Sequence, residues 1–299
     1  MKLDTVVIPV AGLGTRMLPA TKAIPKEMLP IVDKPIIQYV VEEIILSGFK
    51  KIIFVTHSSK NSVENHFDKS FELEATLEKR IRRSSLKEVR SISNQKIEIS
   101  SVRQGEAFGL GHAIKTAKNF IGNKPFAVVL PDRVMHDVSC NLRQDNLSFL
   151  KKSFESKPGN YILLEKVKRA DIKKFGIAKL KKSFNSKNRI QEIELIVEKP
   201  SLDRAPSNYA AVGRYIFLPE IFDFIPDKEI RRDKEIELTD SINNLIKTES
   251  TVYASELTGE CFDCGERQGY LKAILSTAIK RKDTKKFVSK IIKDLLQDS

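Results

Sequence analysis

The residues best suited to do chemistry stand near the N-terminus, where a glycine turn is followed by two cations. Residues 5–10 form an apolar run, and Gly12 and Gly14 come directly after it. Bare backbone N–H groups in a glycine loop that follows a buried strand can bind phosphate. Arg16 and Lys26 follow closely, and cations at that position favour chemistry on the phosphate over simple docking.

Two common glycine-loop motifs do not fit this segment. A dinucleotide-binding fingerprint requires a third glycine at the position that Met17 occupies. A P-loop ends in Gly-Lys-Ser or Gly-Lys-Thr, and residues 11–16 lack that ending. Hydride transfer with a nicotinamide dinucleotide is therefore disfavoured, and another kind of phosphate chemistry is expected.

Alternating apolar and helical patterns predict the elements that position these residues. The first half of the chain predicts strands over residues 6–10, 51–56, 97–103 and 126–130, and helices over 35–47 and 113–120. The middle predicts strands over residues 161–167, 175–180, 190–198 and 210–217. This order is typical of an α/β, Rossmann-like fold with a mostly parallel mixed sheet and helices on both faces. Ligands of such sheets bind beyond the carboxyl ends of strands, where Gly12 and Asp132 stand.

We expect one main domain over residues 1–268 and a helical C-terminal tail over residues 269–299. Within the domain, residues 61–92 repeat apolar side chains at helical spacing among many charges, which predicts a helical insertion. The insertion could cover the sheet or contact another subunit, and the sequence favours neither. The tail likewise could belong to the same domain or form an oligomer contact.

Composition restricts the class of partner. The net charge is +13, and residues 166–189 contain ten Lys or Arg against one acid. Such a stretch can attract nucleic acid, but an aromatic content of 7% without Trp favours a solvated basic face. No apolar run approaches the ~20 residues of a membrane span, and no signal-peptide pattern is present. We therefore expect neither nucleic acid nor membrane as a partner, and a cytoplasmic location.

The three cysteines fit a reducing compartment. Cys261 and Cys264 have the spacing of a redox motif or a zinc knuckle. A structural zinc site needs four ligands, usually from two such pairs, and the chain has no second pair. We interpret these cysteines as flanking Asp263, which matters more.

Nine motifs in order identify the family that the chain resembles. They cover residues 11–16, 25–30, 56–61, 104–112, 130–132, 197–200, 212–215, 238–240 and 263–265. The first two read Ala-Gly-Leu-Gly-Thr-Arg and Pro-Lys-Glu-Met-Leu-Pro. Together they resemble the signature of the sugar-1-phosphate nucleotidyltransferases, from residue 5 to about residue 280. The resemblance implies the nucleotidyltransferase fold.

The resemblance also implies a reaction. A glucose 1-phosphate oxygen would attack the α-phosphorus of UTP, and UDP-glucose and pyrophosphate would form. Positioning and charge neutralisation dominate such transfers. Arg16 would stabilise the departing pyrophosphate, and Lys26 would hold the α-phosphate as charge grows on it. The other nucleotide-binding residues would be Ala11, Gly12, Gly14 and Glu27.

The cofactor implied is Mg²⁺, held by Asp132 and by Asp263 as a second carboxylate. A carboxylate at the end of a buried strand suits Mg²⁺, which takes one or two carboxylates plus phosphate oxygens and water. Gln104 and Gly109 resemble the residues that read the base. A glutamine amide can accept from uracil N3–H and donate to O4, whereas cytosine reverses both polarities. Glycine at 109 would let the backbone approach the ring.

The sugar phosphate is expected to meet four residues: Gly176, Glu198, Lys199 and Gly213. Lys199 resembles the ligand of the phosphate group, and Glu198 resembles the acceptor for sugar hydroxyls. At either glycine a side chain would collide with the ring.

Three positions depart from the usual family pattern. Arg133 stands where an apolar residue is usual, Phe175 where tyrosine is common, and Glu237 where glutamine is common. These departures bear on sugar preference and metal affinity. They leave the reaction type intact.

Two alternatives stay open at this point. A related enzyme of the same superfamily could use dTTP or CTP. An inactive nucleotide- or RNA-binding protein could have kept the fold, although Arg16, Lys26 and Asp132 are all present. The family suggests a homodimer or homotetramer.

Overall fold

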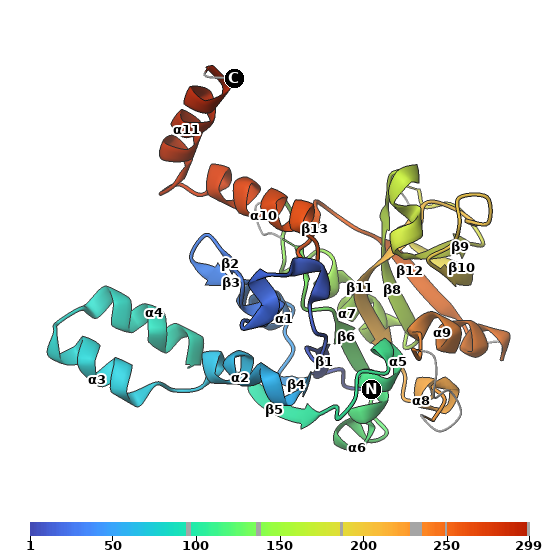
Figure 1. Ribbon diagram of the computed structural model, residues 1–299. Coiled ribbons are helices and arrows are strands. Elements are labelled where there is room, and N and C mark those ends of the chain that lie inside the picture. Colours follow the sequence, from blue (N-terminus) through green and yellow to red (C-terminus); the bar gives the residue numbers. More distant parts are fainter. Residues whose placement is uncertain (94–96, 136–138, 186–187, 228–234, 249, 298–299) are drawn as a thin grey trace.

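Strand β1 (Thr5–Pro9) shows how the apolar run near the N-terminus builds the fold. In the computed structural model (Figure 1), Val6 and Ile8 are buried in one hydrophobic core and Val7 in another. Successive side chains of a strand point to opposite faces of the sheet. A strand whose side chains are all apolar is therefore covered on both faces. The structure describes residues 1–93, 97–135, 139–185, 188–227, 235–248 and 250–297.

The core is a nine-stranded sheet with the order β5-β4-β1-β6-β11-β8-β12-β10-β9. The remaining bounds, in chain order, are β4 Lys51–Thr56, β5 Glu98–Arg103, β6 Phe126–Val129, β8 Asn160–Lys166, β9 Gly176–Leu180, β10 Ile190–Glu198, β11 Tyr209–Phe217 and β12 Val252–Glu256. The α/β mixed sheet predicted from the sequence is confirmed. Parallel pairing is confined to β5-β4-β1-β6 and to β8 with β12, while β11 runs antiparallel to both β6 and β8.

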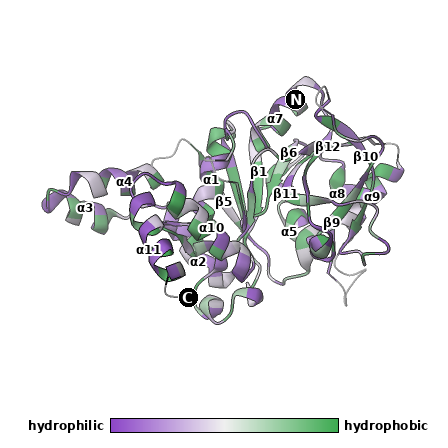
Figure 2. Ribbon diagram, turned by 90° about the horizontal axis from the view of Figure 1, so that it is seen from above, coloured by the Kyte–Doolittle hydropathy of each residue, from purple (hydrophilic) through white to green (hydrophobic). Residues whose placement is uncertain are grey.

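Helices cover both faces of the sheet. Helices α1 (Ile36–Leu46) and α7 (Leu147–Ser156) bury Ile44 and Leu150 in the core that holds Val6. Helices α5 (Gly109–Thr116) and α9 (Leu238–Lys247) bury Ile114 and Ile242 in the core that holds Val7. The smaller helices α6 and α8 span Lys118–Ile121 and Ile221–Phe224. In Figure 2 the hydrophobic colouring gathers on central strands such as β1.

The predicted insertion at 61–92 forms three helices with different surroundings. Helix α2 (Asn61–Phe67) buries Val63 and Phe67, so this part covers the sheet. Helices α3 (Phe71–Lys79) and α4 (Arg83–Ser93) bury no residue and project away from the sheet as a pair (Figure 1). The interpretation as a covering layer therefore holds for α2 alone.

The predicted helical tail is also divided. Helix α10 (Arg267–Lys280) buries Ala273, Thr277 and Ala278 against the body of the protein. Helix α11 (Lys285–Gln297) extends beyond it (Figure 1). Among the residues that the structure describes, no helix is long and apolar enough to cross a membrane.

Candidate active site

The glycine loop leaves β1 and folds back on the segment that carries Lys26. Ala11 is buried where the loop begins, and Gly12 is exposed. Gly14 has a φ of 69°, a left-handed conformation that favours glycine, and its carbonyl accepts a hydrogen bond from Thr21 Oγ1 at 2.8 Å. A side-chain carbon built on Gly14 would lie 3.3 Å from Lys26 Cβ. The loop therefore packs directly on Lys26.

Lys26 and Asp132 form a charged hydrogen bond at the end of β6. Lys26 Nζ lies 2.6 Å from Asp132 Oδ2, and both side chains are largely buried. Burial opposes the charge on Asp132, but Lys26, Arg133 and Arg16 outweigh it and hold the pKa of that carboxyl below its ordinary value. Burial also opposes the charge on Lys26, whose pKa is nevertheless raised by Asp132 and Glu27. Both groups are therefore ionised at neutral pH.

A small two-stranded sheet brings the second aspartate to the first. Strands β7 (Arg133–Met135) and β13 (Cys261–Asp263) pair antiparallel, with Asp263 opposite Arg133. The Cys264 N–H then donates to the Asp132 carbonyl at 2.7 Å, and the Gly265 N–H donates to Asp263 Oδ1 at 3.0 Å. These bonds fix both aspartates beside Gly265.

Gly265 keeps a space open among three charged groups. A side-chain carbon built there would lie 2.6 Å from Asp132 Oδ2, 3.0 Å from Arg16 Nη2 and 3.1 Å from Asp263 Oδ1. The first of these distances is shorter than a carbon–oxygen contact allows, so only glycine at 265 lets these three charged groups come this close. Four residues that the sequence singled out for phosphate and metal therefore meet here: Arg16, Lys26, Asp132 and Asp263.

The donors around Gly265 fit a hard divalent cation that shares its shell with phosphate. Two carboxylates are what Mg²⁺ takes from a protein when phosphate oxygens and water complete the shell. In the described part of the chain, this site included, no group of three or more His, Cys, Asp or Glu side chains is arranged to hold a metal, so a cation here would depend on phosphate and water for the rest of its shell. Cys261 and Cys264 are free thiols, as expected of cysteines that only flank Asp263.

Two of the unusual residues noted in the sequence contact each other behind this site. The Arg133 guanidinium lies over the Phe175 ring, 5.0 Å from its centroid. The same guanidinium is 3.1 Å from Asp263 Oδ2 and 3.3 Å from Glu165 Oε2. Arg133 therefore links Asp263 to the wall of the sugar-binding region. No local pattern in the sequence indicated this link, because its residues come from four separate segments.

A buried arginine, to which the sequence analysis assigned no role, holds the Asp132 segment from behind. Arg214 and Glu43 are 0% and 1% exposed, and Arg214 Nη2 lies 2.6 Å from Glu43 Oε2. Arg214 Nη2 also donates to the Arg133 carbonyl at 2.7 Å, and Nη1 donates to the Leu130 carbonyl at 3.3 Å. These carbonyls stand on either side of Asp132, so the guanidinium fixes that turn. The feature of the sequence that could have indicated this role is an arginine inside an otherwise apolar strand.

Glu27 lies beneath the loop as a buried ion. It is 0% exposed, and its Oε2 accepts from Lys60 Nζ at 2.9 Å. Burial raises the pKa of Glu27 against the opposing effect of Lys26 and Lys60. Its other oxygen has no hydrogen-bond partner among the described atoms. This pair anchors the segment carrying Lys26 to the end of β4.

Of the two residues expected to read the base, Gln104 directly follows β5 and Gly109 begins α5. Gln104 is 4% exposed, and its Nε2 lies 2.7 Å from His112 Nδ1. Gly109 has a φ of 92°, and a side-chain carbon there would lie 3.0 Å from the backbone of Ile236. Packing against Ile236 therefore already requires glycine at 109, whether or not a base approaches it.

Two of the four residues expected to bind the sugar phosphate line a cavity of about 140 Å³ between β9, β10, β11 and α9. Gly176 and Glu198 line this cavity, and a side-chain carbon on Gly176 would lie 3.1 Å from Glu198 Oε2. Lys199 Nζ is 3.4 Å from Glu198 Oε1 and 3.8 Å from Glu237 Oε1. Phe175 and Glu237 line the cavity too, so two of the unusual residues face the sugar-binding region directly.

Gly213 is already required to be glycine by the fold around it. Its φ is 76°, and a side-chain carbon there would lie 2.7 Å from Leu130 Cβ. The pairing of β11 with β8 shifts register between Ala211 and Tyr215, so Gly213 forms a bulge. A side chain at 213 would therefore collide with Leu130, beside the Asp132 turn, whether or not a sugar ring approaches it.

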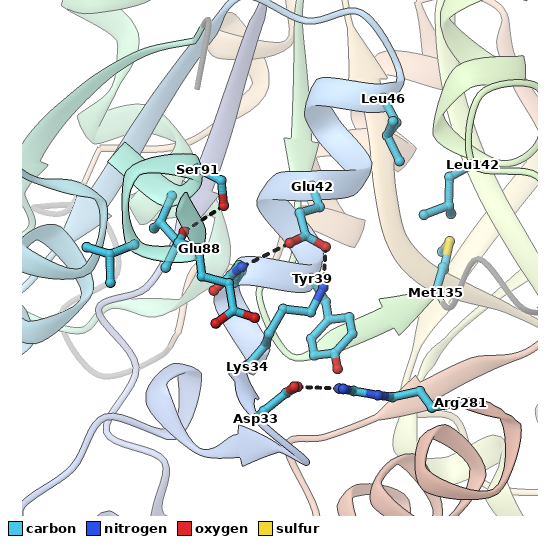
Figure 3. Close-up of a pocket in the computed structure, with 13 residues that line it drawn as sticks. Asp33, Lys34, Tyr39, Glu42, Leu46, Glu88, Ser91, Met135, Leu142 and Arg281 are labelled. Carbon is cyan, nitrogen blue, oxygen red and sulfur yellow. Dashed lines mark hydrogen bonds and ion pairs between the residues drawn. The ribbon is translucent and has the colours of Figure 1, made fainter. Parts of the chain in front are cut away.

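A larger cavity of about 670 Å³ lies elsewhere, between α1, α4 and the residue after α10 (Figure 3). Charged pairs cross it: Lys34 Nζ lies 2.7 Å from Glu42 Oε2, and Asp33 is bound by Arg281. The residues predicted for nucleotide, sugar or metal are not among those that line it. The volume of a cavity alone therefore does not identify the candidate active site.

Sequence comparisons with known proteins agree with the family that the motifs indicate. The chain is 48% identical to a UTP–glucose-1-phosphate uridylyltransferase of Haemophilus ducreyi over 290 residues, which is 97% of this chain and 98% of that protein. It is 48% identical over 279 residues to a protein of the same name from Escherichia coli K12, covering 93% and 91% of the two chains.

Solved structures that resemble this chain carry names of the same kind of enzyme. A UTP-bound UGPase from Acinetobacter baumannii matches with a TM-score of 0.89 at 40% identity, over 98% of this chain and all of that one. A UDP-glucose pyrophosphorylase complexed with UDP-glucose matches with a TM-score of 0.79 at 36% identity, over 94% of this chain and all of that one. The resemblance drawn from the motifs is confirmed, and a nucleotidyl transferase family model matches residues 5–279. The chain therefore belongs to the nucleotidyl transferase family.

Proposed function

We propose that this protein is a uridylyltransferase that transfers UMP from UTP to glucose 1-phosphate. A phosphate oxygen of glucose 1-phosphate attacks the α-phosphorus of UTP, the bond to the β-phosphate breaks, and pyrophosphate leaves with UDP-glucose as the other product. The observation that carries the proposal is the convergence of Arg16, Asp132 and Asp263 on the space beside Gly265, with Lys26 bound to Asp132. The names of relatives that span nearly the whole chain support the same activity.

The protein contributes position and charge. Glycine-loop N–H groups at 12 and 14 bind the triphosphate, and Arg16 faces the pyrophosphate that leaves. Lys26 keeps its bond to Asp132, directs a further ammonium N–H to the α-phosphate and offsets the charge that grows there. Glu27 acts from below by holding the segment of Lys26 through Lys60.

The divalent cation that the family uses is Mg²⁺ in this proposal, held by Asp132 and Asp263. When bound, it neutralises charge on the phosphates of UTP. Arg133 keeps Asp263 in place through its bond to Oδ2, which leaves Oδ1 on the side of Gly265.

Gln104 reads the uracil edge, and Gly109 lets the backbone lie close to the base. Lys199 binds the phosphate of glucose 1-phosphate. Glu198 accepts hydrogen bonds from the sugar hydroxyls beside Gly176, which leaves room for the ring.

The domain division at residue 268 and a homodimer or homotetramer also belong to this proposal. The projecting helices support an association between copies, because Phe71, Ile81 and Phe287 are 78%, 76% and 69% exposed. Covering such exposed apolar side chains with a second copy would remove them from water and stabilise the association. A cytoplasmic location fits a nucleoside triphosphate substrate and a chain with only three cysteines.

The experiment is an assay of pyrophosphate release from glucose 1-phosphate with UTP, dTTP or CTP, each with Mg²⁺ or Mn²⁺. We expect UTP to give the highest kcat/KM and Mg²⁺ to support turnover. Faster turnover with dTTP would contradict the choice of UTP. Absence of turnover with all three nucleotides would contradict the activity itself.

A further inference from the structure

The sugar end of the site contains two carboxylates that share one ammonium group. Lys199 Nζ lies 3.4 Å from Glu198 Oε1 and 3.8 Å from Glu237 Oε1. Glu237 stands at the N-terminus of α9, but its side chain makes no capping hydrogen bond there. Its carboxylate is therefore directed to the cavity rather than used by the helix.

Both acids and a buried hydroxyl line this cavity. Gly176 has no side chain, and one built there would lie 3.1 Å from Glu198 Oε2 and 3.0 Å from Thr239 Cγ2. Thr239 Oγ1 is buried and has no hydrogen-bond partner among the described atoms. Thr239 and both acids line the same cavity, so a polar ligand would meet a hydroxyl and two carboxylates.

The charges in this cavity do not balance once a sugar phosphate is bound. Lys174 also lines it, but its Nζ already pairs with Asp171 at 3.1 Å and Glu266 at 3.2 Å. Lys199 leaves the two carboxylates when it binds the phosphate group. Glu198 and Glu237 then face the sugar without a counter-ion.

The electrostatics around Glu237 support this shortage of positive charge. Burial and the neighbouring Glu198 raise the pKa of Glu237, Lys199 opposes them, and Glu235 and Asp240 raise it further. A cation placed between the two carboxylates would relieve this repulsion, whereas a neutral hydroxyl would not. Hydrogen bonds between two charged groups are also roughly twice as strong as neutral ones.

We propose that this cavity accepts an amino-deoxyhexose 1-phosphate as a second class of substrate, with its ammonium group between Glu198 and Glu237. The inference rests on the proposed uridylyl transfer to glucose 1-phosphate. The chemistry is the same: the sugar phosphate oxygen attacks the α-phosphorus, and pyrophosphate leaves. The product is then a UDP-aminosugar.

The test compares glucose 1-phosphate, glucosamine 1-phosphate and N-acetylglucosamine 1-phosphate as acceptors for UTP, with the wild-type chain and Glu237→Gln. We expect wild-type turnover of glucosamine 1-phosphate. The substitution should lower kcat/KM for glucosamine 1-phosphate by about tenfold or more, since it removes a charged hydrogen bond. It should lower kcat/KM for glucose 1-phosphate by a smaller factor, about two- to threefold. Glu235→Gln removes the same charge from an exposed position two residues earlier and should not change the ratio of the two kcat/KM values.

Each outcome decides the proposal. Turnover of glucose 1-phosphate without turnover of glucosamine 1-phosphate, or an equal loss for both substrates in Glu237→Gln, would overturn the inference and leave the proposed function standing. Use of the neutral N-acetyl sugar as readily as glucosamine 1-phosphate would also overturn it, because cavity size and not charge would then govern. Absence of turnover with glucose 1-phosphate would overturn the proposed function and this inference together.

Discussion

The phosphate end and the sugar end of the site hold their charges in different ways. At the phosphate end, Lys26 and Asp132 form a largely buried pair at 2.6 Å, and Arg214 holds the turn beneath them. At the sugar end, Lys199 is 55% exposed and lies farther from the two carboxylates that share it. The first arrangement has one geometry, whereas the second can rearrange when a ligand enters.

The difference indicates that the phosphate end and the sugar end of the site have different roles. Phosphoryl-type chemistry depends on fixed charges, so small displacements there are costly. Sugar recognition can tolerate a side chain that moves between partners. Substitutions at the phosphate end should therefore affect turnover, and substitutions at the sugar end should affect substrate choice.

The largest effect is expected for Asp132→Ala. It removes a carboxylate of the proposed metal site and the partner of Lys26, so turnover should fall at least about 1,000-fold at any Mg²⁺ concentration. The measurement is pyrophosphate release across a Mg²⁺ titration. Asp203→Ala, at a side chain that is 77% exposed, is the matched control. Activity restored by high Mg²⁺ would mean that the metal is held elsewhere.

Lys199→Ala tests the sugar end of the site. We expect KM for glucose 1-phosphate to rise about 30- to 100-fold through loss of a charged hydrogen bond, while KM for UTP changes about twofold at most. Initial rates with each substrate varied in turn measure this. Lys179→Ala, which removes an equal charge from an exposed ion pair with Glu194, should leave both KM values near wild type. A comparable rise for UTP would contradict the assignment.

Arg214→Lys tests whether the phosphate end is held from behind. Lysine keeps the charge but cannot bind Glu43 and two carbonyls at once. The free energy of unfolding should fall by about 3 kcal/mol, as when a buried pair is broken. Half-saturating Mg²⁺ should rise about tenfold through the displaced Asp132 turn. Denaturant unfolding and a Mg²⁺ titration measure the two effects.

A loss of stability in Arg214→Lys with unchanged Mg²⁺ dependence would assign Arg214 to the core alone. Arg204→Lys, at a side chain that is 84% exposed, is the matched control for both measurements.

The smallest effect is a pH dependence of stability at Glu237. Burial raises the pKa of this carboxyl, as do Glu198, Glu235 and Asp240, while Lys199 lowers it. A folded-state pKa above the unfolded value contributes stability below the unfolded pKa, and this contribution is lost as the pH rises through the folded pKa. Glu237→Gln should therefore unfold with a slightly higher free energy than wild type at pH 7, by less than about 1 kcal/mol because the group is half-exposed.

That difference should disappear when the pH falls below the ordinary glutamate pKa. Urea unfolding at pH 7 and pH 4 measures it. A Glu237→Gln protein less stable than wild type at pH 7 would mean that the Lys199 contact outweighs the surrounding acids.

Local features of the site could be predicted from the sequence. Gly12 and Asp132 follow apolar strands, and strand ends at a sheet edge bring such residues together. The motif around Asp263 indicated a second carboxylate, which the structure places opposite Arg133. The order of strands in the first half followed from the same alternation.

Features that depend on distant contacts could not be predicted. Arg214 acts through Glu43, which stands 171 positions away on α1, and no local pattern links the two. Gly109 and Gly213 were recognised as special, but their neighbours Ile236 and Leu130 are known only from the folded chain. The spacing at 61–92 predicted helices without indicating that α3 and α4 leave the sheet.

The most direct test of the fixed phosphate end is Gly265→Ala. A single added methyl group would lie 2.6 Å from Asp132 Oδ2 and 3.0 Å from Arg16 Nη2, in the space that we assign to cation and phosphate. We predict that pyrophosphate release from UTP and glucose 1-phosphate falls at least about 100-fold in a folded protein. Turnover at the wild-type rate would contradict the assignment of that space.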